Sequence, residues 1–153
     1  MDKNIDLNNL ISWLNDHELK ASTYVPKDRK DHPILRETDV VHNIIIAIKR
    51  GDLNAIELGC DLVIENKHVP FGRTLKSNIL TSLKKHVRFI SKDRQRELSL
   101  LAIVLLNDDY PPKEVKALCK LIKRFDIGFV QLVLDGTISK TKEAQRWVNY
   151  LQI

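Results

Sequence analysis

The sequence predicts an all-α protein of seven or eight helices, arranged as stacked antiparallel hairpins. Apolar residues recur at intervals of three and four along most of the chain, as they do on the buried face of a helix. Helix stop and start residues separate most of these periodic segments. A chain of 153 residues with 43% apolar and 29% charged side chains suits one globular domain. We therefore expect a single domain over residues 1–153.

Within this domain we expect an N-terminal helix in residues 1–21, a connector in residues 22–39 and a helical body in residues 40–153. The connector holds two prolines and alternating charges, which is typical of a loop. The expected helices cover residues 5–20, 40–50, 53–66, 73–88, 92–106, 112–125, 128–134 and 140–151. Two of these segments, 40–48 and 129–134, are rich in β-branched or aromatic residues, so a strand is the alternative there.

Capping residues set the expected starts of four helices. Thr38 or Asp39 precedes the second helix, Asp52 the third, Ser91 the fifth and Ser139 the last. Side chains of these types accept hydrogen bonds from the free backbone N–H groups of a first helical turn. Each such residue therefore predicts a helix boundary.

Packing expectations centre on the third and fifth helices. Gly59, inside the third helix, indicates close approach of a neighbouring helix. The fifth helix is apolar on nearly all sides from Leu98 onward, so we expect it to be the central buried helix. The residues expected to be largely buried are Cys60, Leu83, Leu101, Ile103, Val104, Leu105, Leu118 and Ile122.

A faint internal repeat connects the helical hairpins. Residues 61–66 resemble residues 102–107 at an offset of 41, and residues 80–85 resemble residues 118–123 at an offset of 38. In unit length the pattern resembles HEAT and armadillo repeats, which stack paired helices. The resemblance implies an α-α superhelix, that is, a HEAT-like right-handed solenoid, with an irregular helical bundle as the alternative.

Charge is distributed unevenly between the two halves of the chain. Residues 1–72 carry nine Lys/Arg against twelve Asp/Glu, whereas residues 73–153 carry sixteen against eight. Such asymmetry favours an anionic partner. The basic residues fall at helical spacing opposite the apolar stripes, and we expect them to form one exposed binding face. These candidate residues are Arg73, Lys76, Lys84, Arg88, Lys113, Lys116, Lys120 and Lys123.

Most catalytic signatures are absent from the sequence. It contains no glycine-rich nucleotide loop, no nucleophile elbow and no His pair at metal-ligand spacing. We therefore expect no catalytic residue, no cofactor and no metal site. Assembly of a metal site from His32, His42 and Asp39 stays open, and Asp108 and Asp109 are expected to serve a turn.

The remaining features indicate a cytoplasmic protein. Cys60 and Cys119 each lie in an apolar helical segment, as buried free thiols do in a reducing compartment. The N-terminal residues lack the pattern of a secretory signal, and no apolar run is long enough to span a membrane.

The function that these observations favour is a non-enzymatic binding or scaffold module that recognises another macromolecule. The expected partner is a protein, because helical-repeat surfaces commonly bind proteins. The alternative is non-specific nucleic-acid binding through the basic region at residues 73–124. An enzyme ranks third, since distant residues can assemble a site that no motif announces.

Overall fold

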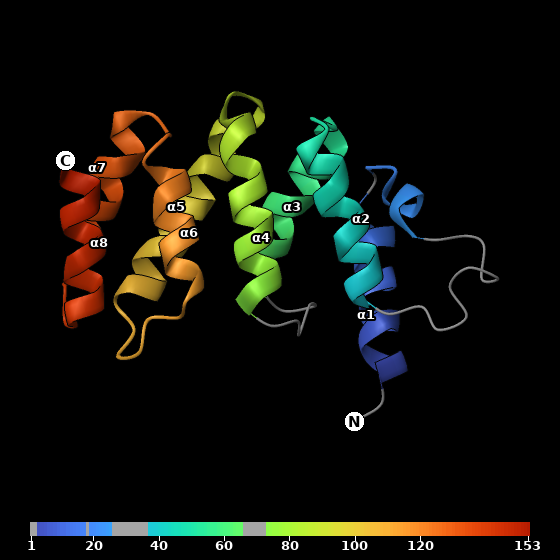
Figure 1. Cartoon of the computed structure of the whole chain (residues 1–153), viewed down its shortest axis with the longest axis horizontal. Coiled ribbons are helices and arrows are strands. Elements are labelled where there is room, and N and C mark those ends of the chain that lie inside the picture. The colour runs from blue at the N-terminus through green and yellow to red at the C-terminus, as the bar shows by residue number, and fades with distance from the viewer. Residues whose placement is uncertain (1–2, 18, 26–36, 66–72) are drawn as a thin grey trace.

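The computed structural model describes residues 3–17, 19–25, 37–65 and 73–153, and these residues form only helices (Figure 1). Eight are α-helices and two are short 3₁₀ helices, so the all-α prediction is confirmed for the described residues, and both segments with a strand alternative are helical. The elements are α1 Lys3–Asp16, η1 Ala21–Tyr24, α2 Glu37–Lys49, α3 Leu53–Glu65, α4 Arg73–Leu83, η2 Lys84–Phe89, α5 Lys92–Leu106, α6 Glu114–Ile122, α7 Ile127–Gly136 and α8 Lys142–Gln152.

The helices stand in two rows. Helices α2, α4, α6 and α8 contact one another in succession, and α3, α5 and α7 do the same behind them (Figure 1). Contacts of α2 and α4 with α3, and of α6 with α5, join the two rows. The two ends of the chain consequently lie at opposite ends of the molecule, with α1 beside α2 and with α8 last.

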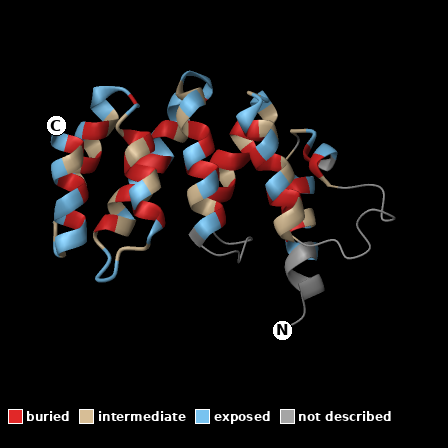
Figure 2. Ribbon diagram, in the orientation of Figure 1, coloured by how far each residue is buried: buried red, intermediate tan, exposed pale blue. Residues whose placement is uncertain are grey.

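Most buried residues are apolar and belong to one core cluster, and Figure 2 marks the buried positions on the ribbon in red. Leu10 of α1, Ile44 of α2 and Leu58 of α3 are fully buried, which is the arrangement that amphipathic helices adopt to remove apolar area from water. Gly59 confirms the predicted close approach: a Cβ there would lie 2.6 Å from Ile48 Cδ1 and 3.3 Å from Ile79 Cγ2. The missing side chain thus lets α2 and α4 pack against α3.

Burial of α5 differs from the prediction. Val104 is 67% exposed, and Leu101, Ile103 and Leu105 are only half-buried, so α5 is not a central helix buried on all sides. It stands in the second row, with one side packed on α3, α6 and α7 and the other facing solvent. The other four predicted core residues, Cys60, Leu83, Leu118 and Ile122, are buried as expected.

The buried side of α5 carries two polar residues that hydrophobicity does not assign to a core. Gln95 donates from Nε2 to the carbonyl oxygen of Ile90 at 2.9 Å. Ser99 Oγ donates to the carbonyl oxygen of Gln95 at 2.8 Å. These bonds offset part of the cost of burying the two side chains beside Leu98 and Leu106. Gln95 Oε1 is buried without a hydrogen-bond partner in the described part of the chain.

Two of the predicted caps are confirmed. Asp52 Oδ1 accepts from the backbone N–H groups of Asn54 and Ala55 at 2.9 and 3.3 Å. Ser91 Oγ accepts from the N–H of Arg94 at 3.3 Å. Both residues therefore mark the starts of α3 and α5, as expected from their side chains.

The other two predicted caps are wrong. Helix α2 already begins at Glu37, so Thr38 and Asp39 lie inside its first turn. Helix α8 is capped by Thr141, whose hydroxyl accepts from the N–H of Ala144 at 3.0 Å. Ser139 has a φ of 61°, whereas an N-cap residue has extended backbone.

Several helices are shorter than their periodicity suggests. Helix α1 ends at Asp16, α6 covers only Glu114–Ile122, and α4 gives way to η2 at Lys84. Within η2 the backbone of His86, with φ −122° and ψ 27°, is not helical. Of the predicted connector, residues 26–36 lie outside the described part of the chain. Its described flanks form η1 and the first turn of α2.

Candidate functional sites

A groove between α4 and α6 gathers four of the eight predicted basic residues. It has a volume of about 260 Å³, and its lining consists of Ser77, Thr81, Lys84, Lys113, Lys116, Ala117 and Lys120. Helices α4 and α6 are direct neighbours. Lys84 of η2, which directly follows α4, therefore borders the same depression as the lysines at the start of α6 and within it. We call it the lysine groove.

The other four predicted basic residues lie elsewhere. Lys76 is only 14% exposed, with Nζ 4.0 Å from Glu114 Oε1. Lys123 Nζ donates to the carbonyl oxygens of Tyr150 and Leu151 at 3.0 and 3.1 Å, where a cation stabilises the C-terminal end of α8. Both were expected on exposed surface, as were Lys84 and Lys120 of the lysine groove. All four are half-buried, so the expectation is wrong for them, whereas it is confirmed for Lys113 and Lys116.

The remaining two are Arg88 and Arg73. Arg88 is exposed, and its guanidinium lies 4.7 Å from the centre of the Phe89 ring. The side chain of Arg73 lies outside the described part of the structure. Only the residues of the lysine groove therefore form a joint basic site among the described candidates.

A second groove, of about 290 Å³, runs between α2 and α4. Its lining consists of His42, Ile45, Ile46, Lys49, Asn78, Thr81 and Ser82. Thr81 borders both grooves, so the two form one continuous surface, which we call the α2–α4–α6 face. Ile46 is 46% exposed on it, and neither groove has an Asp or Glu among its lining residues.

Hydroxyl groups on this face act as acceptors. Thr81 Oγ1 donates its proton to the carbonyl oxygen of Ser77 at 2.8 Å, and Ser82 Oγ donates to that of Asn78 at 2.7 Å. A hydroxyl has one proton and two lone pairs. The oxygen of exposed Thr81 can therefore accept a hydrogen bond from a partner, whereas Ser82 is buried. The lysines supply donors and positive charge.

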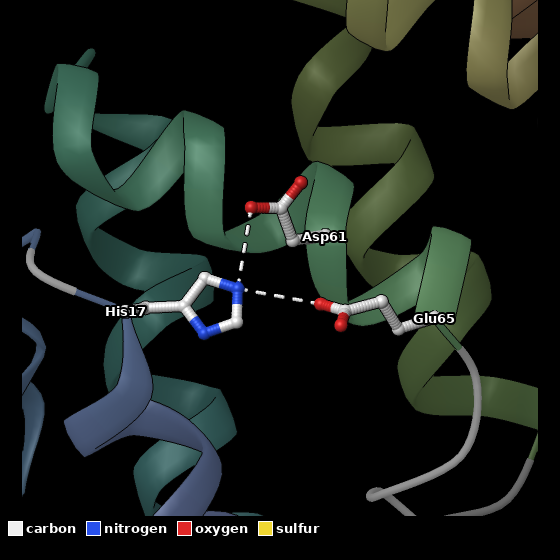
Figure 3. Close-up of side chains that lie close together, drawn as sticks. All are labelled: His17, Asp61 and Glu65. Carbon is white, nitrogen blue, oxygen red and sulfur yellow. Dashed lines mark ion pairs between the residues drawn. The ribbon is translucent and has the colours of Figure 1, made fainter.

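A second constellation joins α1 to α3 at one end of the molecule. His17 Nε2 lies 3.5 Å from Asp61 Oδ2 and 3.3 Å from Glu65 Oε2 (Figure 3). The three ligand-type atoms all lie within 4.8 Å of one another. We call these three residues the His17 cluster.

Each member of the His17 cluster is oriented by a further group. His17 Nδ1 lies 2.8 Å from the carbonyl oxygen of Trp13, whose indole Nε1 donates to Glu65 Oε2 at 2.9 Å. Arg94 donates from two nitrogens to the two oxygens of Asp61, both at 3.0 Å. The hydrogen bond to Asp61 raises the pKa of Arg94 above its ordinary value, so the guanidinium stays charged.

The sequence did not single out the His17 cluster. Its histidine and carboxylates lie far apart in the chain, and only the packing of α1 on α3 brings them together. Of the metal set considered from the sequence, His32 lies outside the described residues. His42 borders the groove between α2 and α4 instead.

The two cysteines lie in the interior of the folded protein. Cys60 and Cys119 are free and buried. Burial raises the pKa of each thiol to about 12, because a thiolate is poorly solvated in an apolar interior. The reactive form of cysteine, the thiolate, is thereby suppressed.

Comparison with known proteins gives no family assignment: no family model, curated protein or solved structure matches the chain. Among the described helices, none combines the length and the apolar character that crossing a membrane requires. The lysine groove and the His17 cluster are therefore the two candidate sites of the protein.

Proposed function

We propose that the protein is a non-enzymatic helical binding module whose α2–α4–α6 face takes an acidic segment of a partner protein. The observation that carries the proposal is the lysine groove, where Lys84, Lys113, Lys116 and Lys120 line one depression that no carboxylate borders. Like charges at such spacing repel one another in the free protein. An acidic ligand relieves this repulsion and supplies electrostatic complementarity.

Chemistry beside the lysines favours a polypeptide over a nucleic acid. The hydroxyl oxygen of exposed Thr81 is available as an acceptor, and a peptide backbone offers N–H donors that a phosphodiester backbone lacks. Exposed Ile46 offers an apolar contact for one side chain of the partner. No aromatic residue lines either groove, so a stacking platform for bases is missing there.

Nucleic-acid binding through residues 73–124 is the second candidate, since four lysines in one groove also suit phosphates. As part of the main proposal, the two rows of helices act as a rigid scaffold of the HEAT-like solenoid kind, which presents long surfaces to partners.

We also propose that the protein is cytoplasmic, because the free thiols of Cys60 and Cys119 remain reduced in that compartment.

Selection from a peptide pool tests the proposal. The pool consists of 12-residue peptides with four Asp or Glu and one Ile, Leu or Phe, and binding is followed by fluorescence anisotropy at low salt. We expect a selected peptide to lose affinity by about 3- to 150-fold in the variant Lys113→Ala, Lys116→Ala, Lys120→Ala, because each exposed ion pair contributes about 0.2–1 kcal/mol.

The matched control is the variant Lys85→Ala, Arg96→Ala, Lys140→Ala, which removes the same net charge outside the grooves. It should bind the selected peptide as the unmodified protein does. The proposal would be contradicted if both variants lost the same affinity for the peptide, or if the protein selected no acidic peptide from the pool. The nucleic-acid candidate would instead be supported if random-sequence RNA or duplex DNA bound the unmodified protein and the control variant but did not bind the groove variant.

A further inference from the structure

We propose that the His17 cluster is a binding site for a divalent transition-metal cation such as Zn²⁺. The ligand atoms would be His17 Nε2, Asp61 Oδ2 and Glu65 Oε2 (Figure 3), with water completing the coordination shell. The proposal is independent of the acidic-segment function, because the cluster joins α1 to α3 and shares no residue with the α2–α4–α6 face.

Distances within the cluster suit a metal. Zn²⁺ binds nitrogen and oxygen ligands at about 2.0–2.2 Å, so neighbouring ligands in a tetrahedral shell lie about 3.3–3.6 Å apart. Nε2 of His17 lies 3.5 Å from Asp61 Oδ2 and 3.3 Å from Glu65 Oε2. The ligand atoms of Asp61 and Glu65 lie at most 4.8 Å from each other, which is the third side of the ligand triangle. The Glu65 side chain is 43% exposed, so it has room to move closer to Asp61 when a metal binds.

The orientation of the imidazole ring also points to a cation. A carbonyl oxygen only accepts hydrogen bonds, so the contact of 2.8 Å between His17 Nδ1 and Trp13 O places the ring proton on Nδ1. In the neutral ring Nε2 then directs a lone pair at two carboxylates. Three acceptors that converge in this way are held together by positive charge between them, either a metal cation or a second ring proton on Nε2, and the experiment below distinguishes the two. A backbone carbonyl on the other ring nitrogen is the usual support of a metal-bound histidine.

Local charge matches a divalent ion. Arg94 neutralises part of the charge of Asp61 and of Glu57, whose Oε1 lies 3.6 Å from its Nη1. Three carboxylates and one guanidinium leave a net charge of −2 around the imidazole. The mixed nitrogen and oxygen ligand set favours Zn²⁺ and its first-row neighbours over Mg²⁺ and Ca²⁺, which prefer oxygen ligands.

Titration of the untagged, metal-stripped protein with Zn²⁺ tests the site, with calorimetry as the readout. Co²⁺ supplies a second readout, since the paramagnetic ion should quench the fluorescence of Trp13, whose ring centre lies 3.9 Å from that of His17. A Trp147→Phe background leaves Trp13 as the only tryptophan. We expect one Zn²⁺ per chain and a rise in the unfolding temperature, because a cation that binds only the folded state stabilises it.

Two variants remove a ligand while preserving the helices. His17→Gln and Glu65→Gln should each weaken Zn²⁺ binding by at least about tenfold, and Gln at position 65 keeps an acceptor for the Trp13 indole. His42→Gln is the matched control, because His42 is an exposed helical histidine outside the cluster, and it should bind Zn²⁺ normally. Circular dichroism confirms that each variant is folded.

Absence of stoichiometric Zn²⁺ uptake would overturn the proposal, as would uptake that His17→Gln and Glu65→Gln leave unchanged. Either result would assign a proton to Nε2 and make the cluster an ion pair that fastens α1 to α3. Loss of acidic-peptide binding in the lysine variant would not affect this conclusion, so the two proposals fail separately.

Discussion

Replacing Leu106 by alanine tests where the core of α5 lies. Leu106 is fully buried at the end of that helix. Removing its branched end loses the transfer free energy of three carbon atoms and leaves a cavity, and such changes cost about 2–5 kcal/mol. We expect about 3 kcal/mol for Leu106→Ala, which is a large part of the 5–15 kcal/mol that stabilises a typical domain.

Val104→Ala is the internal control, because Val104 lies on the same helix and is 67% exposed. Its free energy of unfolding should change by less than about 0.5 kcal/mol. Urea unfolding followed by circular dichroism measures both variants. With a slope of about 2 kcal/mol per molar urea, Leu106→Ala should lower the midpoint by about 1.5 M. Equal shifts for the two variants, or a larger shift for Val104→Ala, would refute the assigned orientation of α5.

Further predictions concern glycine packing and the thiols. A Cβ at Gly136 would lie 2.6 Å from Ile103 Cδ1, whereas one at Gly128 meets nothing within 4 Å. Gly136→Ala should therefore destabilise the protein by about 1–3 kcal/mol, and Gly128→Ala should stabilise it by up to about 1 kcal/mol; thermal unfolding distinguishes the two. Cys60 and Cys119 should resist a thiol reagent at pH 8 until urea unfolds the protein, and rapid native labelling would contradict their burial. Since the pKa of both thiols is raised to about 12, the folded state keeps protons that the unfolded state loses above its ordinary thiol pKa. The free energy of unfolding should then fall as pH rises from about 9 to about 12, and less steeply in a Cys60→Ala, Cys119→Ala variant.

Helix identity was predictable from the sequence because it depends on local periodicity. Ala144, Trp147, Val148 and Leu151 recur at intervals of three and four residues, and all four are buried on one side of α8. Asp52 and Ser91 marked helix starts for the same reason, since a cap acts on the turn that follows it. Burial around α5 was not predictable in this way. A helix apolar on many sides does not reveal which side meets its neighbours, and Gln95 and Ser99 are buried through hydrogen bonds.

For the candidate-site residues, too, the local features were predictable from the sequence and the long-range contacts were not. Helical spacing predicted that Lys113, Lys116 and Lys120 share one side of α6, and the contact of α4 with α6 adds Lys84 to them. Spacing could not predict that Lys123 turns to the carbonyl groups at the end of α8. Such contacts join residues far apart in the chain, and only the packed helices bring them together.

A charge-swap measurement tests the central claim most directly, which is that the lysine groove binds an acidic segment. The protein variant Lys116→Glu, Lys120→Glu should lose the selected acidic peptide, because like charges placed in contact across an interface repel. A version of that peptide with two acidic residues replaced by lysine should bind this variant more tightly than it binds the unmodified protein. Restored binding would place the peptide in the groove between α4 and α6. The account would be contradicted if the variant still bound the acidic peptide. It would also be contradicted if no lysine-substituted peptide, at any pair of positions, bound the variant more tightly than the unmodified protein.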